Sequence, residues 1–173
     1  MNRDMKDKIL LDCDVLIHFQ KGGKLSVLGD LFSEDLILLD IVKDEFYAIN
    51  RQPALFDFFI ERYHIDVIDF PTDDPLLLSE FTGLSKNFGR GESACMAFAR
   101  FNKNIIASSN LKDIKSYCFR HSITIYTTMD ILNLAEEKGL LAEQECDEFI
   151  TTVRNKNSRL PVQSLSEYRE MKK

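Results

Sequence analysis

The sequence lacks the paired cysteines and histidines that hold zinc or form disulfides. Its four cysteines lie far apart, no two of them form a Cys-x-x-Cys pair, and its three histidines show no metal-ligand spacing. We therefore expect buried free thiols in a reducing compartment, with zinc only a remote alternative. The residues concerned are Cys13, Cys95, Cys118, Cys146, His18, His64 and His121.

Long apolar runs are also missing. No stretch reaches the roughly 20 residues that a membrane-spanning helix needs. The first seven residues, MNRDMKD, are polar and of mixed charge, and two aspartates interrupt the apolar run behind them, which is not the pattern of a signal peptide. We expect a cytoplasmic protein with no membrane partner.

Positive charge is in short supply as well, since 22 Lys and Arg face 28 Asp and Glu for a net charge of −6. This balance argues against a protein that coats nucleic acid electrostatically. It does not exclude an enzyme that handles a phosphodiester through a bound metal, because clustered acids then belong to the site.

The length of 173 residues, with 45% hydrophobic and 29% charged residues, is typical of one globular domain. We predict a single domain over residues 1–160. From Asn157 onward the apolar periodicity is lost. We therefore expect residues 161–173 to form a C-terminal tail that packs loosely or trails into solvent.

The most informative stretch is KILLDCDVLIHF, residues 8–19. Its apolar residues 9–11 predict a buried strand of a parallel sheet, and two aspartates follow closely. Carboxylates at the point where a strand gives way to a helix lie at the carboxyl edge of the sheet, where open α/β folds bind their ligands. Alternatively, Asp12 or Asp14 merely caps the next helix.

Short apolar strands alternate with amphipathic helices along the rest of the chain. This pattern predicts an α/β fold with a central, mostly parallel five-stranded sheet flanked by helices. The expected strands cover residues 9–11, 36–39, 65–68, 104–107 and 123–126. The expected helices cover residues 15–20, 24–32, 41–50, 54–63, 76–81, 111–121, 129–138 and 142–155, and one more helix follows Arg90 or Gly91.

Two glutamates lie on helix faces that should be buried. Glu45 lies within an apolar stripe whose members are Ile41, Val42, Phe46 and Ile49. Glu92, in the first turn of a later helix, shares a face with Cys95 at a spacing of three. A buried carboxylate is costly unless it is paired or coordinates a metal. The alternatives are that Glu45 reaches water at the edge of its stripe and that the helix dipole alone favours Glu92.

Strand ends that meet at one edge of the sheet would gather Asp12, Glu45, Glu92 and the turn at residues 108–110 into one pocket. Several carboxylates stay ionised together only with a cation among them. Oxygen ligands suit Mg²⁺ or Mn²⁺, and such a metal supports phosphodiester hydrolysis by activating a water molecule. Four basic residues either contact phosphates or are ordinary solvated charges, namely Lys86, Arg90, Lys112 and Lys115.

The sequence resembles the PIN domain (PilT N-terminus) nucleases, a family that includes VapC-type toxins. The matching motifs are, in order, ILLDCDVLI, IVKDEF, GRGESACMAFA, IIASSNLKDI and ITIYTTMDILNLAEEKGLL. The resemblance implies a three-layer PIN-like fold and a Mg²⁺- or Mn²⁺-dependent ribonuclease. It also implies an acidic catalytic metal site at Asp12, Glu45 and Glu92, with Asn110 at the fourth position and Asp14 as an accessory residue.

The chain departs from the family pattern in this fourth element. The family usually has an aspartate in a TDD or TND turn after the fourth strand, where this sequence reads Ser108-Ser109-Asn110. Asn110 offers an oxygen ligand but no charge, so we expect weaker metal affinity. Ser108 and Asp113 are further accessory candidates, and Asp113 could replace the missing carboxylate. The spacing Asn110-x-x-Asp113 also fits a capping-box-like helix start.

The sequence therefore predicts a metal-dependent endoribonuclease that acts on RNA. The toxin role, a small antitoxin protein as partner and a homodimer are further expectations from the resemblance. The alternative is a catalytically weak or inactive PIN-like module that binds RNA or a protein partner, which the missing aspartate and the net acidity favour. An aspartate-nucleophile phosphatase ranks lower, because DCDVL resembles the start of that class but its later lysine and acidic motifs do not follow in suitable order.

Overall fold

The computed structural model describes residues 7–173, apart from the side chain of Glu34. Residues 1–6, which the predicted 1–160 domain includes, lie outside the described residues. Five strands form one sheet in the order β3-β2-β1-β4-β5, and each neighbouring pair is parallel. The strands are β1 (Ile9–Leu11), β2 (Leu36–Leu39), β3 (Asp66–Ile68), β4 (Ile105–Ala107) and β5 (Ile125–Tyr126).

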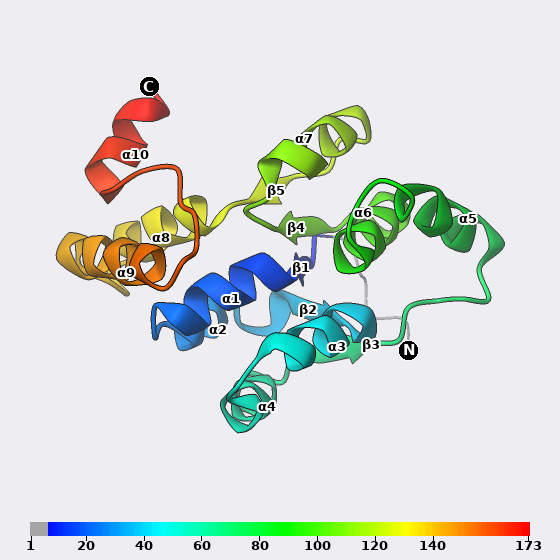
Figure 1. The fold of residues 1–173 in the computed structure, drawn as a ribbon, viewed down its shortest axis with the longest axis horizontal. Helices are drawn as coiled ribbons and strands as arrows, with labels where there is room; N and C mark the ends of the chain where they lie inside the picture. Colours follow the sequence, from blue (N-terminus) through cyan, green and yellow to red (C-terminus); the bar gives the residue numbers. More distant parts are fainter. Residues whose placement is uncertain (1–6) are drawn as a thin grey trace.

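Helices connect the strands and surround the sheet (Figure 1). The predicted three-layer α/β fold with a central parallel sheet is confirmed. The helices are α1 (Cys13–Lys21), α2 (Leu25–Phe32), the 3-10 helix η1 (Ser33–Asp35), α3 (Asp40–Ile49), α4 (Pro53–Arg62), α5 (Pro75–Leu84), α6 (Arg90–Asn102), α7 (Leu111–Arg120), α8 (Thr128–Glu137), α9 (Glu143–Asn155) and α10 (Leu165–Met171).

The central strands β1 and β2 are buried along their whole length. Their continuous apolar sequences, ILL and LILL, match this position, because a parallel strand covered by helices on both faces has no solvent side. The outer strand β3 is partly exposed and carries Asp66 in its sequence DVI. The strands with continuous apolar sequences therefore lie inside the sheet, and the strand that contains an aspartate lies at its edge.

The strand order reverses between β1 and β4. The chain builds β2 and β3 on one side of β1 and then crosses over to place β4 and β5 on the other side. Leu11 pairs with Ala107, so β1 and β4 end next to each other. In open α/β sheets, ligands bind in the crevice outside the carboxyl ends of strands at such a reversal. The residues that follow Leu11 and Ala107 therefore lie where such a fold is expected to bind a ligand.

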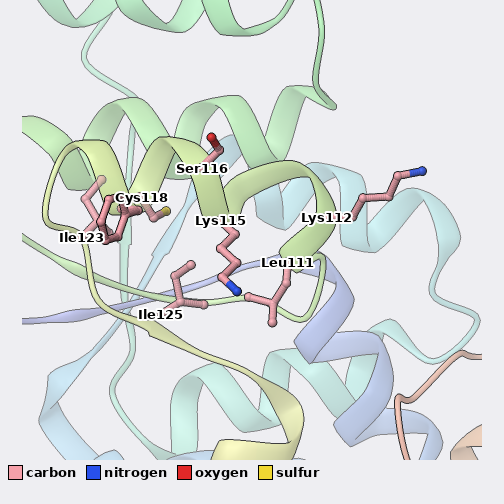
Figure 2. Close-up of a pocket in the computed structure, with 8 residues that line it drawn as sticks. Leu111, Lys112, Lys115, Ser116, Cys118, Ile123 and Ile125 are labelled. Carbon is pink, nitrogen blue, oxygen red and sulfur yellow. The ribbon is translucent and has the colours of Figure 1, made fainter.

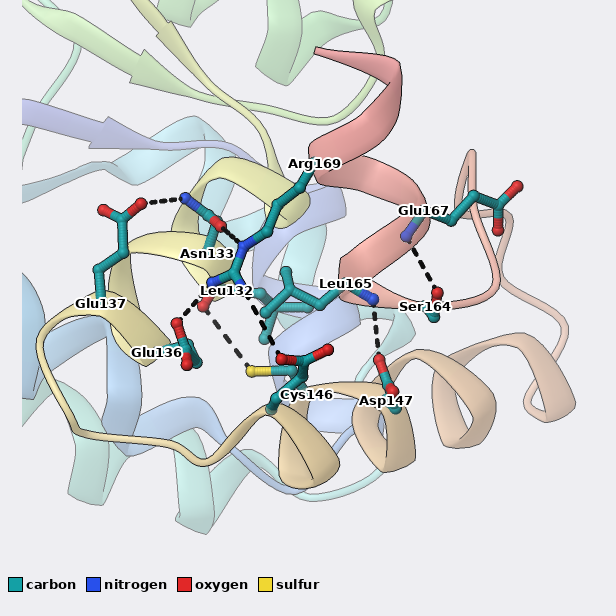
Figure 3. Close-up of polar contacts among 11 residues, drawn as sticks. Leu132, Asn133, Glu136, Glu137, Cys146, Asp147, Ser164, Leu165, Glu167 and Arg169 are labelled. Atoms are coloured by element: carbon teal, nitrogen blue, oxygen red, sulfur yellow. Dashed lines mark hydrogen bonds and ion pairs between the residues drawn. The ribbon is translucent and has the colours of Figure 1, made fainter. Parts of the chain in front are cut away.

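The expected loose tail after residue 160 is wrong. The last helix, α10, packs on α8 and α9 (Figure 3) and buries Leu165 and Tyr168. The backbone N–H of Leu165 donates to Asp147 of α9 at 2.8 Å, and the Arg169 guanidinium donates to Asn133 of α8 at 2.7 Å. The buried apolar residues of this segment are too few for a periodicity to stand out in the sequence.

The prediction of free thiols is confirmed, whereas the predicted burial of Ile49, at the end of α3, is wrong. The four cysteines are free, and all except the half-buried Cys13 are buried. Ile49, predicted to lie in a buried stripe, is the last residue of α3 and is 57% exposed. Among the described residues, no helix is long and apolar enough to cross a membrane.

Candidate active site

Asp12 lies directly after β1, in the middle of the sheet, and is only 3% exposed. Its backbone N–H donates to the carbonyl oxygen of Ala107 at 3.0 Å, so β1 and β4 remain connected up to this residue. Its side-chain Oδ1 accepts from the N–H of Cys13 at 2.7 Å and caps α1. The cap interpretation is therefore confirmed. It does not exclude a ligand role, because a carboxylate has several acceptor positions.

Asp14, in the first turn of α1, holds the turn that follows β4. Its Oδ2 accepts from the backbone N–H of Ser109 at 2.8 Å, and the hydroxyl of the buried Ser108 lies 3.4 Å from the same oxygen. Its Oδ1 accepts from the N–H of Val15 at 2.7 Å. The turn at residues 108–110 is thereby fixed against the start of α1.

Glu45 connects α3 to the beginning of α6. Its Oε1 accepts from the backbone N–H of Gly91 at 2.9 Å. This N–H belongs to the first turn of α6, where backbone donors have no partner within the helix. A Cβ added to Gly91 would lie 2.3 Å from Oε2 of Glu45, so any larger residue would move the Glu45 carboxylate from its present position. Glu45 is half-buried, and its charge is one of the influences that raise the pKa of Glu92.

Glu92 and Asp113 are joined through Asn110. The Asn110 side-chain amide donates to Oε1 of Glu92 and, at 2.8 Å, to Oδ2 of Asp113. Asn110 is the N-cap residue of α7, but its side chain makes no capping hydrogen bond. The predicted capping-box-like start is thus wrong. The reason is that the amide serves two carboxylates, one of which comes from a different helix.

A buried polar chain behind this turn was not predicted from the sequence. The Ser109 hydroxyl donates to Oγ1 of Thr128 at 2.7 Å, and Oγ1 lies 2.8 Å from Nδ1 of His18. Burial lowers the pKa of His18 to about 4, with the nearby charge of Lys21 acting in the same direction. The imidazole is therefore neutral near pH 7 and can accept at Nδ1. Ser109 lies in the turn that was expected to join the pocket, and Thr128 follows the capping-box residue Thr127 at the start of α8, whereas no sequence pattern indicated the contact of either with His18.

The predicted phosphate contacts lie outside this group of carboxylates. Arg90 is the first residue of α6 and is exposed. Lys112 and Lys115 are exposed on α7, beside a surface hollow of about 640 Å³. Figure 2 shows Lys115 directed toward Leu111 and Ile125, whereas Lys112 extends away along the surface. All three can reach solvent, and none is bonded to an acidic residue of the site within the described part of the chain.

The sequence model of the DUF3368 family, described as a PIN domain, matches residues 8–172. The chain belongs to the PIN-domain family. The match extends beyond residue 160, in agreement with the packing of α10 on this PIN domain. A search of curated proteins finds no match to the chain. PIN domains are generally nucleases that use divalent metal ions, and the resemblance of the motifs is thereby confirmed at the level of the family.

Electrostatics show how the acidic residues of this PIN domain influence one another. Burial, together with the charge of Asp14, raises the pKa of Asp12 well above its usual value. Burial also raises the pKa of Asp14 to about 6, against the hydrogen bonds from Ser109 and Val15, and the charge of Glu92 adds to the rise. Burial likewise raises the pKa of Glu92, although the Asn110 amide opposes the effect. The anionic forms are thus destabilised by burial and by mutual repulsion.

The donor set fits a hard divalent cation by its chemistry, since it consists of carboxylate and amide oxygens. The positions of these side chains, however, do not form a ready metal site. Within residues 7–173, no group of three or more His, Cys, Asp or Glu side chains is arranged so that it could hold a metal ion. Glu45 accepts a hydrogen bond from Gly91, and Glu92 accepts one from Asn110, so a cation has to compete with these two hydrogen bonds. Binding would in return relieve the repulsion that raises the carboxylate pKa values.

Proposed function

We propose that this PIN domain is a Mg²⁺- or Mn²⁺-dependent endoribonuclease. Asp12, Glu45, Glu92 and Asn110 would hold the metal, and Asp14 would position the turn at residues 108–110. The observation that carries the proposal is the set of destabilised carboxylates Asp12, Asp14 and Glu92 at the reversal of strand order. Repelling anions at the expected ligand crevice are explained by a cationic partner there.

The residues of the chain would contribute binding and orientation. A bound divalent ion supplies Lewis acidity toward a phosphoryl oxygen and lowers the pKa of water for attack on phosphorus. Asp12 is held in place by its bond to Cys13, and Asp14 fixes Ser109 and with it the orientation of Asn110. Asp12 is buried, where the dielectric constant is lower than in water, and this strengthens the attraction between its carboxylate and a cation.

The test compares cleavage of a labelled single-stranded RNA by the wild-type protein and by Asp12→Asn, in Mn²⁺, in Mg²⁺ and in EDTA. Asparagine is also a good N-cap residue, so this variant should fold normally. We expect metal-dependent cleavage that falls by at least about 100-fold in the variant, as for the loss of a directly acting charged group. Equal cleavage by both proteins, or cleavage that persists in EDTA, would reject the proposal.

A catalytically weak or inactive PIN module is the second candidate, and the Asn110 amide favours it. The amide already satisfies Glu92 and Asp113 without a cation. Calorimetric titration with Mn²⁺ separates the two. Tight binding at one or two ions per chain supports the nuclease, whereas absent or millimolar binding supports the module.

The toxin role is a further part of the proposal. An antitoxin or a second copy of the chain would need an apolar docking surface, and α4 exposes Leu55 and Phe58. Growth arrest on induced expression, absent with Asp12→Asn, supports the toxin role. Light scattering of wild type and Phe58→Ser tests for a homodimer through this surface.

A further inference from the structure

A groove of about 710 Å³ begins at the turn that follows β4. Ser109 and Asn110 line one end of it, and the start of α7 forms one wall. The opposite wall comes from residues 159–161 and from α10. The segment expected to be a loose tail therefore forms part of a groove that reaches the candidate active site at Ser109 and Asn110.

Cations predominate in this groove. Lys112, Lys115 and Arg159 line it, all are exposed, and none forms an ion pair with another described residue. Lys172 also lines it and is paired with Asp130 at 2.9 Å. The groove thus carries three unneutralised positive charges in a chain whose net charge is −6. Such a local excess attracts a polyanion in spite of the overall charge.

Apolar side chains line the same groove as these cations. Leu111 is 37% exposed, Met171 is 60% exposed, and Pro161 is exposed as well. In a duplex the base faces are stacked inside, so a duplex offers phosphates but little apolar surface. A single strand offers both phosphates and base faces. A groove lined by both cations and apolar side chains matches the single strand.

We infer that the groove between α7 and the C-terminal segment binds single-stranded RNA and leads it to the turn at residues 108–110. Lys112, Lys115 and Arg159 contact phosphates, and Leu111, Pro161 and Met171 contact bases. Tyr168 and Lys172 attach the C-terminal wall to α8 through Asp130. The cleavage of the bound RNA rests on the proposed nuclease function, whereas the binding of RNA in the groove requires no cleavage.

The test measures fluorescence anisotropy of a labelled oligouridylate in EDTA, where no metal-dependent cleavage takes place. The groove variant is Lys112→Gln/Lys115→Gln/Arg159→Gln. A triple control carries the same changes at exposed basic residues outside the groove, Arg51→Gln/Lys103→Gln/Lys138→Gln. We expect the Kd of the groove variant to rise at least about tenfold, and the slope of log K against log salt to fall by about 2, at about 0.7 per lost phosphate contact.

The control should bind like wild type, and thermal unfolding should confirm that all three proteins are folded. An unchanged Kd and salt slope in the groove variant would overturn the inference, as would equal loss in the control. Equal affinity of wild type for a matching RNA duplex would overturn the choice of a single strand. If groove-dependent binding is found but metal-dependent cleavage is not, the proposed nuclease fails and the groove assignment stands.

Discussion

At the scale of single residues, Asn110 is the most consequential departure from the family pattern. Its amide donates to Glu92 and Asp113, two carboxylates that come from different helices. A carboxylate at this position would have no hydrogen to donate and would repel both neighbours. The asparagine thus favours the metal-free fold, whereas an aspartate would favour a bound cation.

Asn110→Asp should therefore lower stability without metal and strengthen metal binding. We expect the free energy of unfolding in EDTA to fall by about 1–3 kcal/mol, the cost of losing hydrogen bonds to charged groups. The Mn²⁺ affinity should rise about tenfold, which corresponds to about 1.4 kcal/mol. Urea unfolding and calorimetry measure the two quantities. Asn157→Asp, at an exposed position, is the matched control, and weaker Mn²⁺ binding by Asn110→Asp would contradict the role assigned to residue 110.

Gly91 allows a second residue-scale prediction. Gly91→Ala removes a glycine from the first turn of α6, which by itself stabilises by at most about 1 kcal/mol, but it displaces Glu45 from its 2.9 Å hydrogen bond. The two effects oppose each other, so we expect little change in stability and a clear loss of metal-dependent cleavage. Gly83→Ala is the control, because a Cβ at Gly83 of α5 meets nothing within 4 Å. This control should gain stability and keep its activity. Full activity of Gly91→Ala would show that the position of Glu45 is unimportant.

At the scale of elements, α10 depends on one carboxylate of α8. Asp130 closes the capping box with Thr127 and also accepts from Tyr168 and Lys172. Burial raises the pKa of Asp130, but the hydrogen bonds from Thr127, Tyr168 and Lys172 outweigh it and hold the pKa below its usual value. One side chain thus starts a helix and attaches another.

Asp130→Asn should destabilise the protein by about 1–2 kcal/mol, since it weakens both the cap and the charged hydrogen bonds. Hydrogen exchange should show the loss concentrated in α10 and the start of α8. Asp73→Asn, on an exposed loop, serves as the reference. Exchange in α10 that matches wild type would mean that Leu165 and Tyr168 suffice to hold the helix.

At the scale of the whole molecule, the sheet was predictable and part of the site was not. The apolar runs of β1 and β2 identify the strands because these strands are buried on both faces. The strand ends then place Asp12 beside the turn at residues 108–110. The bond of Glu45 to Gly91 and the role of Ser109 depend on contacts between distant segments, which leave no local pattern. The helix α10 was not predicted at all, because its apolar residues are few.

The stability of the protein in acid tests the hydrogen bonds that connect Ser109, Thr128 and His18 behind the site. The pKa of His18 is lowered from 6.5 to about 4. Between these two pH values the imidazole is protonated in the unfolded state and neutral in the folded state. The contribution of His18 to stability is therefore complete above pH 6.5 and is lost as the pH falls to about 4, by at most roughly 3 kcal/mol. The raised pKa of Asp14, about 6, acts in the opposite direction, because its protonation on acidification relieves a destabilised anion.

A difference between variants isolates the histidine from these carboxylates. His18→Asn keeps an acceptor near the position of Nδ1 but has no titration, so its unfolding free energy should fall less than that of wild type between pH 6.5 and 4. His64→Asn is the control, because His64 is exposed and asparagine tolerates its φ of 50°. Urea titrations across this pH interval give the comparison. Parallel pH profiles of wild type and His18→Asn would mean that His18 accepts its proton in the folded protein and that the chain from Ser109 through Thr128 to His18 opens in acid.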